Sequence, residues 1–505
     1  MNYKELAESL AKTIETMSGS IATLTEEVAQ LKALLLEKDK SLEAKAAQLN
    51  GLTKIALPQK NEKVKCYVDT TLTEKTPAPT PKERGNNGAK RKVYQVEELE
   101  VINVEPDDEI FKAQKADAVF LFSREVVRYK YIPPRLVKQI YSCRKYRLGD
   151  NLYEGKAPIA PLLNSNFDSS IIANIIQQRF VYGLPVERIV KQYNEMGIDM
   201  PKATAHGLLT KVGEMLDRLD PILKEAILAD EYLHFDETHH TILDKSKSGG
   251  SFKGYFWAAL SQKLGLMHIF ISEGSRAKAV FTKYLPQSYR GAVQSDGYSS
   301  YKVVEGWDYP SAIRLGCIQH CKRKFLEIEQ QGEAKEIIDI YNEFYHIRHN
   351  HPKEEWVERS VEVIERLERR LRELERDKDS LGNGALSGAV AYSLNELESV
   401  RNIISSTEYE LDNNAIERPM RYISTSRKNS MFAGSMRGAK RMALIYSLAI
   451  SCRLNGVNSF AYFCDVINRL AELSPSTPQE KLRELLPDKW KSSEIIILPQ
   501  IRTAS

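Results

Sequence analysis

The sequence lacks any apolar run of the roughly 18 to 20 residues that a membrane-spanning helix needs, and its first residues, Met1 to Glu5, do not begin a signal peptide. It also lacks paired CxxC motifs, because its six cysteines are scattered, which argues against a disulfide framework and against a strong zinc site. An excess of charge of one sign is missing too, since the net charge of the 505 residues is only +4. We therefore expect a cytoplasmic protein of several domains without membrane contact, in which the local concentration of positive charge matters more than its total.

A coiled-coil pattern is present near the N-terminus. Apolar side chains follow alternating steps of four and three residues, which is the a/d spacing of a coiled coil. They are Ile14, Met17, Ile21, Leu24, Val28, Leu31 and Leu35. A single amphipathic helix packed on its own domain is the alternative, but a regular run of heptads is better explained by a partner helix. We predict that residues 3–50 make the protein a homo-oligomer, most simply a dimer.

A basic, aromatic stretch follows the linker. Residues 51–92 are rich in proline, glycine and lysine, which predicts a flexible basic linker. Arg124 to Ile132 and Leu136 to Tyr146 then alternate basic with apolar or aromatic residues around Pro133 and Pro134, as the two arms of a β-ribbon would. This excess of positive charge favours nucleic acid over an ordinary solvated face. The candidate DNA contacts are Arg124, Arg128, Lys130, Arg135, Lys138, Arg144, Lys145 and Arg147.

Helical periodicity marks the next region. Two of its expected helices are joined through Gly197 to Met200, and Pro201 opens the second of them, which is the layout of a helix-turn-helix motif. An ordinary helical hairpin explains the pattern equally well. In the first interpretation the second helix presents Lys202, His206 and Lys211 to DNA.

Asp236 lies in an expected strand, Leu233 to His240, which precedes two more expected strands, Gly254 to Leu260 and Leu266 to Ile271. An ionised carboxylate on a buried strand costs several kcal/mol unless a cation lies beside it. A metal ion is therefore the natural partner of Asp236.

Two further acids have related settings. Asp296 ends a short apolar strand and is followed by Gly297. Glu417 lies on an expected helix that begins with Asp412 as its N-cap, and the segment Arg418 to Arg441 contains seven basic residues and no acid. Such a segment suits a carboxylate that holds cations while phosphates lie alongside.

Taken together, these motifs resemble the transposases of bacterial insertion sequence family sixty-six. The motifs are Asp236-Glu237-Thr238, Asp296-Gly297-Tyr298, the run His320 to Phe325, Asp412 to Arg418, Arg427 to Ser435 and Leu454 to Asn458. The resemblance extends from the coiled coil to about Leu470. It implies a DDE transposase with an RNase H-like α/β core, in which Asp236, Asp296 and Glu417 are the catalytic and metal-binding triad. It also implies double-stranded DNA, at the element ends and at the target, as the partner, and elements of this kind often encode small accessory proteins.

The residue chemistry agrees with that implication. Three carboxylates without cysteine or neutral histidine suit Mg²⁺ or Mn²⁺ better than zinc. Two such ions can activate a water to cut a phosphodiester and then a DNA 3′-hydroxyl to join it. Further contacts to DNA are expected from polar residues near the acids, which are His320, Arg323, Asn413, Arg418, Arg421, Arg427 and Lys428.

Two other functions stay open. His234, Asp236 and His240 share one strand face because their spacings are even, so a zinc-dependent hydrolase is conceivable. Cys317 and Cys321 have no fourth ligand nearby in the sequence, and we interpret them as packing residues. A transposase relative that binds DNA without catalysis is the other alternative, against which the presence of all three acids argues.

The resulting fold class is a multidomain α/β protein. Its expected parts are a coiled coil (1–50), a linker (51–92), a small β-rich DNA-binding module (93–160), a helical helix-turn-helix-like domain (161–229), the first part of the catalytic core (230–326), a helical insertion (327–405), the last part of the core (406–450) and a helical C-terminal region with a tail (451–505). The module departs from the family, whose members usually carry two zinc-binding CxxC pairs there, because Tyr146 stands where a partner of Cys143 is expected. We therefore expect no zinc in the module, and stabilisation by apolar residues such as Val104, Val137 and Ile140 instead.

Overall fold

The computed structural model describes residues 136–492, except 149, 248, 273–275 and 377–383, together with the single residues 116 and 134. Apart from residue 116, these belong to one compact unit formed by residues 127–505. The predicted coiled coil, the linker and most of the basic module lie outside the described residues, as do Arg124, Arg128, Lys130 and Arg135. Within the described ranges, no helix is both long enough and apolar enough to cross a bilayer.

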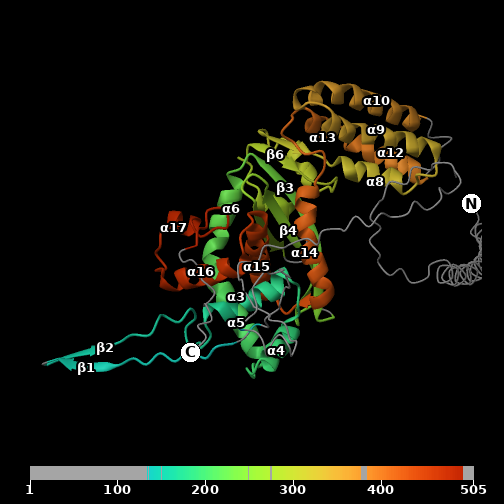
Figure 1. The fold of residues 1–505 in the computed structure, drawn as a ribbon. Helices are drawn as coiled ribbons and strands as arrows, with labels where there is room; N and C mark the ends of the chain where they lie inside the picture. The colour runs from blue at the N-terminus through green and yellow to red at the C-terminus, as the bar shows by residue number, and fades with distance from the viewer. Residues whose placement is uncertain are drawn as a thin grey trace, which may run out of the picture. The chain divides into compact units, whose positions relative to one another are not determined.

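The described residues form a mixed α/β structure that is mostly helical, with one mixed sheet at its centre (Figure 1). The sheet order is β5-β4-β3-β6-β7, and β8 pairs with the C-terminal end of β3. β4 is antiparallel to both β3 and β5, whereas β6 and β8 run parallel to β3, and β7 runs parallel to β6. The strands are β1 (Lys145–Leu148), β2 (Asn151–Glu154), β3 (Tyr232–Leu243), β4 (Ser251–Ser261), β5 (Leu266–Ser272), β6 (Gly291–Gln294), β7 (Ala312–Leu315) and β8 (Phe432–Ala433).

Helices precede the sheet, interrupt it and follow it. The α-helices are α3 (Ser169–Ile176), α4 (Val186–Glu195), α5 (Lys202–Leu216), α6 (Asp220–Leu228), α7 (Lys278–Tyr284), α8 (Ile318–Leu326), α9 (Gly332–Asn350), α10 (Trp356–Arg376), α12 (Ala385–Asn395), α13 (Leu397–Ile404), α14 (Asn414–Ser430), α15 (Met436–Leu454), α16 (Ser459–Glu472) and α17 (Gln479–Arg483). Short helical turns are η2 (Gln177–Val181), η3 (Asp217–Leu219), η4 (Tyr301–Glu305) and η5 (Lys353–Glu355).

The sheet separates two hydrophobic cores. Successive side chains of a strand point to opposite faces, and in β6 Val293 belongs to the core shared with α3 to α6, α15 and α16, whereas Ala292 belongs to the core of α8 to α13. The helices α8, α9, α10, α12 and α13 pack on one another as one group beside β6 and β7 (Figure 1). The inserted helices thus cover one face of the parallel half of the sheet.

Helix α15 covers the edge strand β5. The backbone N–H groups of Met267 and Ile269 donate to the hydroxyls of Ser451 and Ser447 over 2.9 and 2.7 Å. Ser447 and Ser451 are one helical turn apart and therefore match the two-residue step of the strand. These contacts satisfy the open edge of the sheet, which would otherwise be free to pair with another chain.

Apolar residues recur at helical spacing along α10, and this stripe faces the core of the inserted helices. Ile364, Leu367, Leu371 and Leu374 of α10 are buried there. Val361, nearer the start of the helix, is 40% exposed, so the buried part of the stripe begins only beyond this residue.

The predicted β-ribbon can be compared only over its second arm, Leu136 to Tyr146, because its first arm lies outside the described residues. That arm is wrong in its position, because residues 136–144 form no strand, and β1 pairs with β2 so that Leu148 lies opposite Asn151. The proline pair around which the ribbon was expected therefore precedes both strands. Every residue of the hairpin is exposed, and so are Val137 and Ile140, which therefore do not stabilise the module as we expected.

Candidate active site

The sheet places Asp236 and Asp296 side by side, at equal positions along two neighbouring strands. β3 and β6 pair in parallel up to His234 and Gln294, and each aspartate lies two residues beyond that pair. Neighbouring parallel strands carry residues of equal register side by side. A cavity of about 240 Å³ opens at this point, and its lining includes Asp236, Asp296 and Glu417. Residues that are 60 and 121 positions apart in the sequence thus share one cavity.

Glu417 reaches the cavity from the first turn of α14. The position of this turn is set by Asn413, whose side-chain amide donates to the carbonyl of Phe235 over 2.8 Å and whose Oδ1 lies 3.1 Å from Nδ1 of His234. At its other end, α14 is held by Arg427, which donates to Thr238 Oγ1 over 3.0 Å and to the carbonyl of His239. Both ends of the helix are therefore fastened to the strand that carries Asp236.

These contacts change two sequence-based interpretations. The N-cap of α14 is Asn413 and not Asp412, whose carboxylate instead accepts a hydrogen bond from the N–H of Asn414 over 2.9 Å. Asn413 is buried, with 1% of its surface exposed, and its amide is used within the protein. We therefore interpret Asn413 as a residue that positions Glu417, because a buried and bonded amide has little left to offer to DNA.

The electrostatics of the cavity favour a cation. Burial raises the pKa of Asp236 well above its usual range, and the neighbouring carboxylates of Glu237, Asp296 and Glu417 raise this pKa further. A divalent cation between these groups would offset both the burial and the repulsion. The donor set is made of oxygens, which fits Mg²⁺ or Mn²⁺.

Glu237 also lines the cavity, although the sequence argument gave it no role. Its side chain is almost fully buried, accepts hydrogen bonds from Tyr301 and forms an ion pair with Arg276, whose Nε lies 2.8 Å away. Because Arg276 already neutralises this carboxylate, Glu237 is suited to support the site and not to bind an ion there. Its position directly after Asp236 is the sequence signal that could have indicated it.

The loop that carries Asp296 is anchored by the helical insertion. The N–H of Gly297 donates to the hydroxyl of Tyr392 on α12 over 3.2 Å. The carbonyl of Asp296 accepts a hydrogen bond of 3.3 Å from Arg314, a fully buried residue that also pairs with Glu396 over 2.6 Å. A side chain at Gly297 would meet Tyr392 and Glu396 at less than 3 Å, so this position requires glycine. No sequence pattern marked these three partners.

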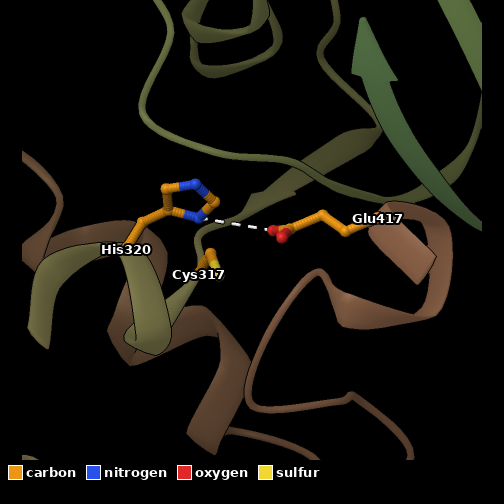
Figure 2. A group of neighbouring side chains, drawn as sticks. All are labelled: Cys317, His320 and Glu417. Carbon is orange, nitrogen blue, oxygen red and sulfur yellow. Dashed lines mark ion pairs between the residues drawn. The ribbon is translucent and has the colours of Figure 1, made fainter. Parts of the chain in front are cut away.

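A second group of potential ligands adjoins the carboxylates. Cys317 precedes α8, His320 lies in its first turn, and Glu417 faces them from α14 (Figure 2). The ligand atoms of the three lie within 4.8 Å of one another, and they are the one such group of three or more cysteine, histidine or acidic side chains in the described part of the chain. The donor set is therefore richer than the three carboxylates that the sequence indicated.

The histidine cluster expected for a zinc hydrolase does not assemble in the described residues. His234 and His240 are both buried, and His234 is bonded to Asn413. Burial lowers the pKa of each histidine to about 4. Neither belongs to the group of potential ligands.

His240 leads to a pH prediction. Burial lowers the pKa of His240 in the folded protein to about 4, below the ordinary value of 6.5. Between pH 6.5 and pH 4, the imidazole therefore binds a proton in the unfolded chain but not in the folded protein. Stability is thus lost as the pH falls from 6.5 towards 4. We expect His240→Phe to reduce this loss, measured as the urea midpoint against pH, whereas substitution of the exposed His349 by Phe should leave the profile unchanged. Parallel profiles for wild type and His240→Phe would contradict the prediction.

The predicted DNA contacts are distributed over several surfaces. Lys138, Arg144, Lys145 and Arg147 are exposed in or before the hairpin, and Lys145 pairs with Glu154 over 2.9 Å. On α5, Lys202, His206 and Lys211 are exposed, but Lys202 pairs with Glu187 and Lys211 donates to the carbonyl of Leu163. Arg323, Arg418, Arg421 and Lys428 are exposed, and Arg421 and His320 line the cavity. Arg427 is half-buried against β3, so it has a structural role as well.

Helices α4 and α5 pack together as both sequence interpretations require. The backbone of Gly197 has a φ of 95°, which a residue with a side chain rarely adopts, and this turn ends α4. The buried face of α5 also packs on α15 and α16. The exposed strip with Lys202 and His206 is what remains for a partner.

Comparisons with known proteins are consistent with this geometry. Residues 164–441 match the Transposase IS66 family, and residues 447–487 match the IS66 C-terminal element. Three proteins of Sinorhizobium fredii are also similar. Uncharacterized protein y4jD is 27% identical over 382 residues, 72% of this chain and 73% of that protein. Uncharacterized protein y4qI is 25% identical over 392 residues (73% and 71%), and uncharacterized protein y4hP is 25% identical over 406 residues (72% and 69%).

Proposed function

The chain belongs to the IS66 family of transposases, and from this premise we propose that it is a DDE transposase whose RNase H-like core cuts and joins DNA with divalent metal ions held by Asp236, Asp296 and Glu417. The observation that carries the proposal is the meeting of these three carboxylates, from β3, from the loop after β6 and from α14, in one cavity. The first strand of the core lies in the centre of the sheet, with antiparallel neighbours on one side and parallel ones on the other, which supports the RNase H-like assignment.

The proposed chemistry is phosphodiester hydrolysis followed by transesterification. Two Mg²⁺ or Mn²⁺ ions would polarise the scissile phosphate and activate first a water and then a DNA 3′-hydroxyl. The role of the protein is to hold the three carboxylates in fixed positions. Asn413 fixes Glu417 relative to β3, and Arg314 and Tyr392 fix the backbone around Asp296. Arg421, at the wall of the cavity, is placed to contact a DNA phosphate.

We also propose roles for the other regions of the chain. The exposed basic hairpin of the 93–160 module and the exposed strip of α5 contribute binding to the element ends, the helical insertion (327–405) supports the Asp296 loop, and residues 3–50 join two chains. The core is thus formed by 230–326 and 406–450. Accessory proteins of the same element are possible further partners.

The proposal is tested with the DNA that flanks the reading frame. Purified full-length protein should cut this DNA at the element ends in Mg²⁺ or Mn²⁺, leave 3′-hydroxyl ends and join them to a target, and EDTA should stop the reaction. Binding to the same DNA without cleavage in either metal would favour the alternative of a DNA-binding relative without catalysis.

The basic face of α14 gives a further prediction. Arg418 and Arg421 are exposed on the helix that carries Glu417, and each phosphate contact contributes about 0.9 to the slope of log affinity against log salt. We expect the double substitution of Arg418 and Arg421 by Ala to weaken binding to all DNA sequences and to reduce the slope by about one to two units.

The matched control for this experiment is Arg359→Ala on α10. Arg359 is also exposed, but it pairs with Glu355 in the insertion and does not line the cavity. Filter binding or fluorescence anisotropy at several salt concentrations gives both slopes. A slope that stays at the wild-type value in the double variant would remove Arg418 and Arg421 from the DNA-binding surface.

A further inference from the structure

The group of Cys317, His320 and Glu417 has a donor set that differs from that of the carboxylate site. Nδ1 of His320 lies 3.6 Å from a carboxylate oxygen of Glu417, and the thiol of Cys317 lies beside both (Figure 2). The spacing of Cys317 and His320, three residues apart at the start of α8, places both on one side of the first turn. Glu417 completes the group from the facing helix.

The environment of these atoms fits a metal ligand better than simple packing. Nδ1 of His320 is buried and has no hydrogen-bond partner among the described residues, and an unpaired buried nitrogen costs free energy that a bound cation would remove. The thiol of Cys317 accepts a hydrogen bond from the N–H of Asn413 over 3.3 Å. Such an N–H donor orients a sulfur ligand in the way that supporting partners orient ligands in metal sites.

The chemistry of the donors selects the cation. Thiolate and imidazole are soft or intermediate ligands that suit zinc and similar ions, whereas Mg²⁺ and Mn²⁺ prefer oxygen. Three protein ligands with one open position are the usual arrangement of a zinc ion that is accessible to solvent.

We propose that Cys317, His320 and Glu417 form a binding site for a zinc-class divalent cation, and that an ion in this site withdraws Glu417 from the carboxylate site and thereby releases its Mg²⁺ or Mn²⁺. The second part rests on the proposed function, because it requires Glu417 to be a ligand of the catalytic ions. The first part does not, because it depends on the three side chains alone. Zinc would act on the protein as an inhibitor that competes for one shared carboxylate.

The site is tested with Co²⁺ alone, added to the full-length protein without DNA. Thiolate ligation of Co²⁺ gives a near-ultraviolet charge-transfer band, and we expect this band to saturate at about one ion per chain. Cys317→Ser should abolish the band, and His320→Ala should weaken Co²⁺ binding at least tenfold, roughly the lower limit of what loss of a supporting partner costs in metal sites.

Two other cysteines provide matched controls. Cys321 is buried one turn further along α8, and Cys143 is exposed; substitution of either by Ser should leave the band intact. Absence of the band from the wild-type protein, or its persistence in Cys317→Ser, would overturn the proposed site. The wild-type spectrum can overturn the proposed site without any variant, so the test does not depend on whether the variants fold.

Competition between the two sites is tested by electron paramagnetic resonance of bound Mn²⁺. Added Zn²⁺ should release Mn²⁺ from the wild-type protein and not from Cys317→Ser, and equal release from both would contradict the coupling. Asp296→Asn separates this outcome from failure of the proposed function, because it removes a carboxylate ligand but retains the thiol, the imidazole and Glu417. This variant should keep the Co²⁺ band whether or not the wild-type protein cleaves DNA.

Discussion

Asp236→Asn, Asp296→Asn and Glu417→Gln are each expected to lower DNA cleavage and strand transfer by at least roughly 10³-fold, as the loss of one member of a catalytic unit typically does. Each substitution keeps the shape of the side chain but removes the charge that binds a cation. DNA binding should change little, because none of the three residues is proposed to contact a phosphate directly. Cleavage assays and gel shifts on the DNA flanking the reading frame measure the two effects separately.

The control for these variants is Glu410→Gln. Glu410 is an exposed acid close to the start of α14, and it does not line the cavity. Its substitution removes the same charge near the same helix and should preserve cleavage. Wild-type activity in any one of the three triad variants would remove that residue from the site.

Glu396→Ala is expected to destabilise the protein by about 3 kcal/mol, the lower end of the cost of breaking a buried ion pair, because Arg314 keeps a second partner in Glu305. The charge left behind is that of Arg314, whose side chain is fully buried, lies 2.6 Å from Glu396 and is then paired only with the partly exposed Glu305. Lys302 pairs with the same carboxylate over 2.8 Å, and Arg314 also holds the carbonyl of Asp296. The urea midpoint should therefore fall, and cleavage should fall with it at temperatures where the protein remains folded.

A double variant distinguishes an unpaired charge from simple loss of packing. Replacing Arg314 by Met together with Glu396 by Leu removes both charges, and such replacements of buried pairs are often neutral for stability. The double variant should recover most of the midpoint but not the activity, since Asp296 still lacks its anchor. Glu343→Ala, which breaks an exposed ion pair with Arg366 in the same insertion, is the control and should change the midpoint little. A midpoint for Glu396→Ala as high as that of this control would contradict the account.

The central strands were predictable from the sequence because their signals are local, whereas the grouping of the three acids came from the family resemblance. β3, β4 and β5 extend the predicted strands by a few residues at their ends, since alternating aromatic and β-branched residues are a direct signal of a strand. Asp296 and Glu417 stood out through Gly297 and through the basic segment that follows. The cavity that joins them depends on the parallel pairing of β3 with β6, which local pattern does not encode.

The features that the sequence did not reveal depend on long-range contacts. Asn413 resembles a surface residue of a helix start, but the carbonyl of Phe235 and the ring of His234 bury it. Tyr392 and Glu396 carry no motif, and they matter only because the insertion folds back on the Asp296 loop. Alternation of basic and apolar residues does not by itself fix where a strand begins, so the expected arm Leu136 to Tyr146 starts nine residues before β1.

Electron paramagnetic resonance of Mn²⁺ bound to the protein in complex with DNA from the element end tests whether Asp236, Asp296 and Glu417 hold the metal ions. We expect about two bound Mn²⁺ ions per active site in the wild-type protein. Asp236→Asn, Asp296→Asn and Glu417→Gln should each lose bound Mn²⁺ and retain binding to the DNA. The same amount of bound Mn²⁺ in the wild-type protein and in all three variants would show that these carboxylates are not the ligands of the metal ions.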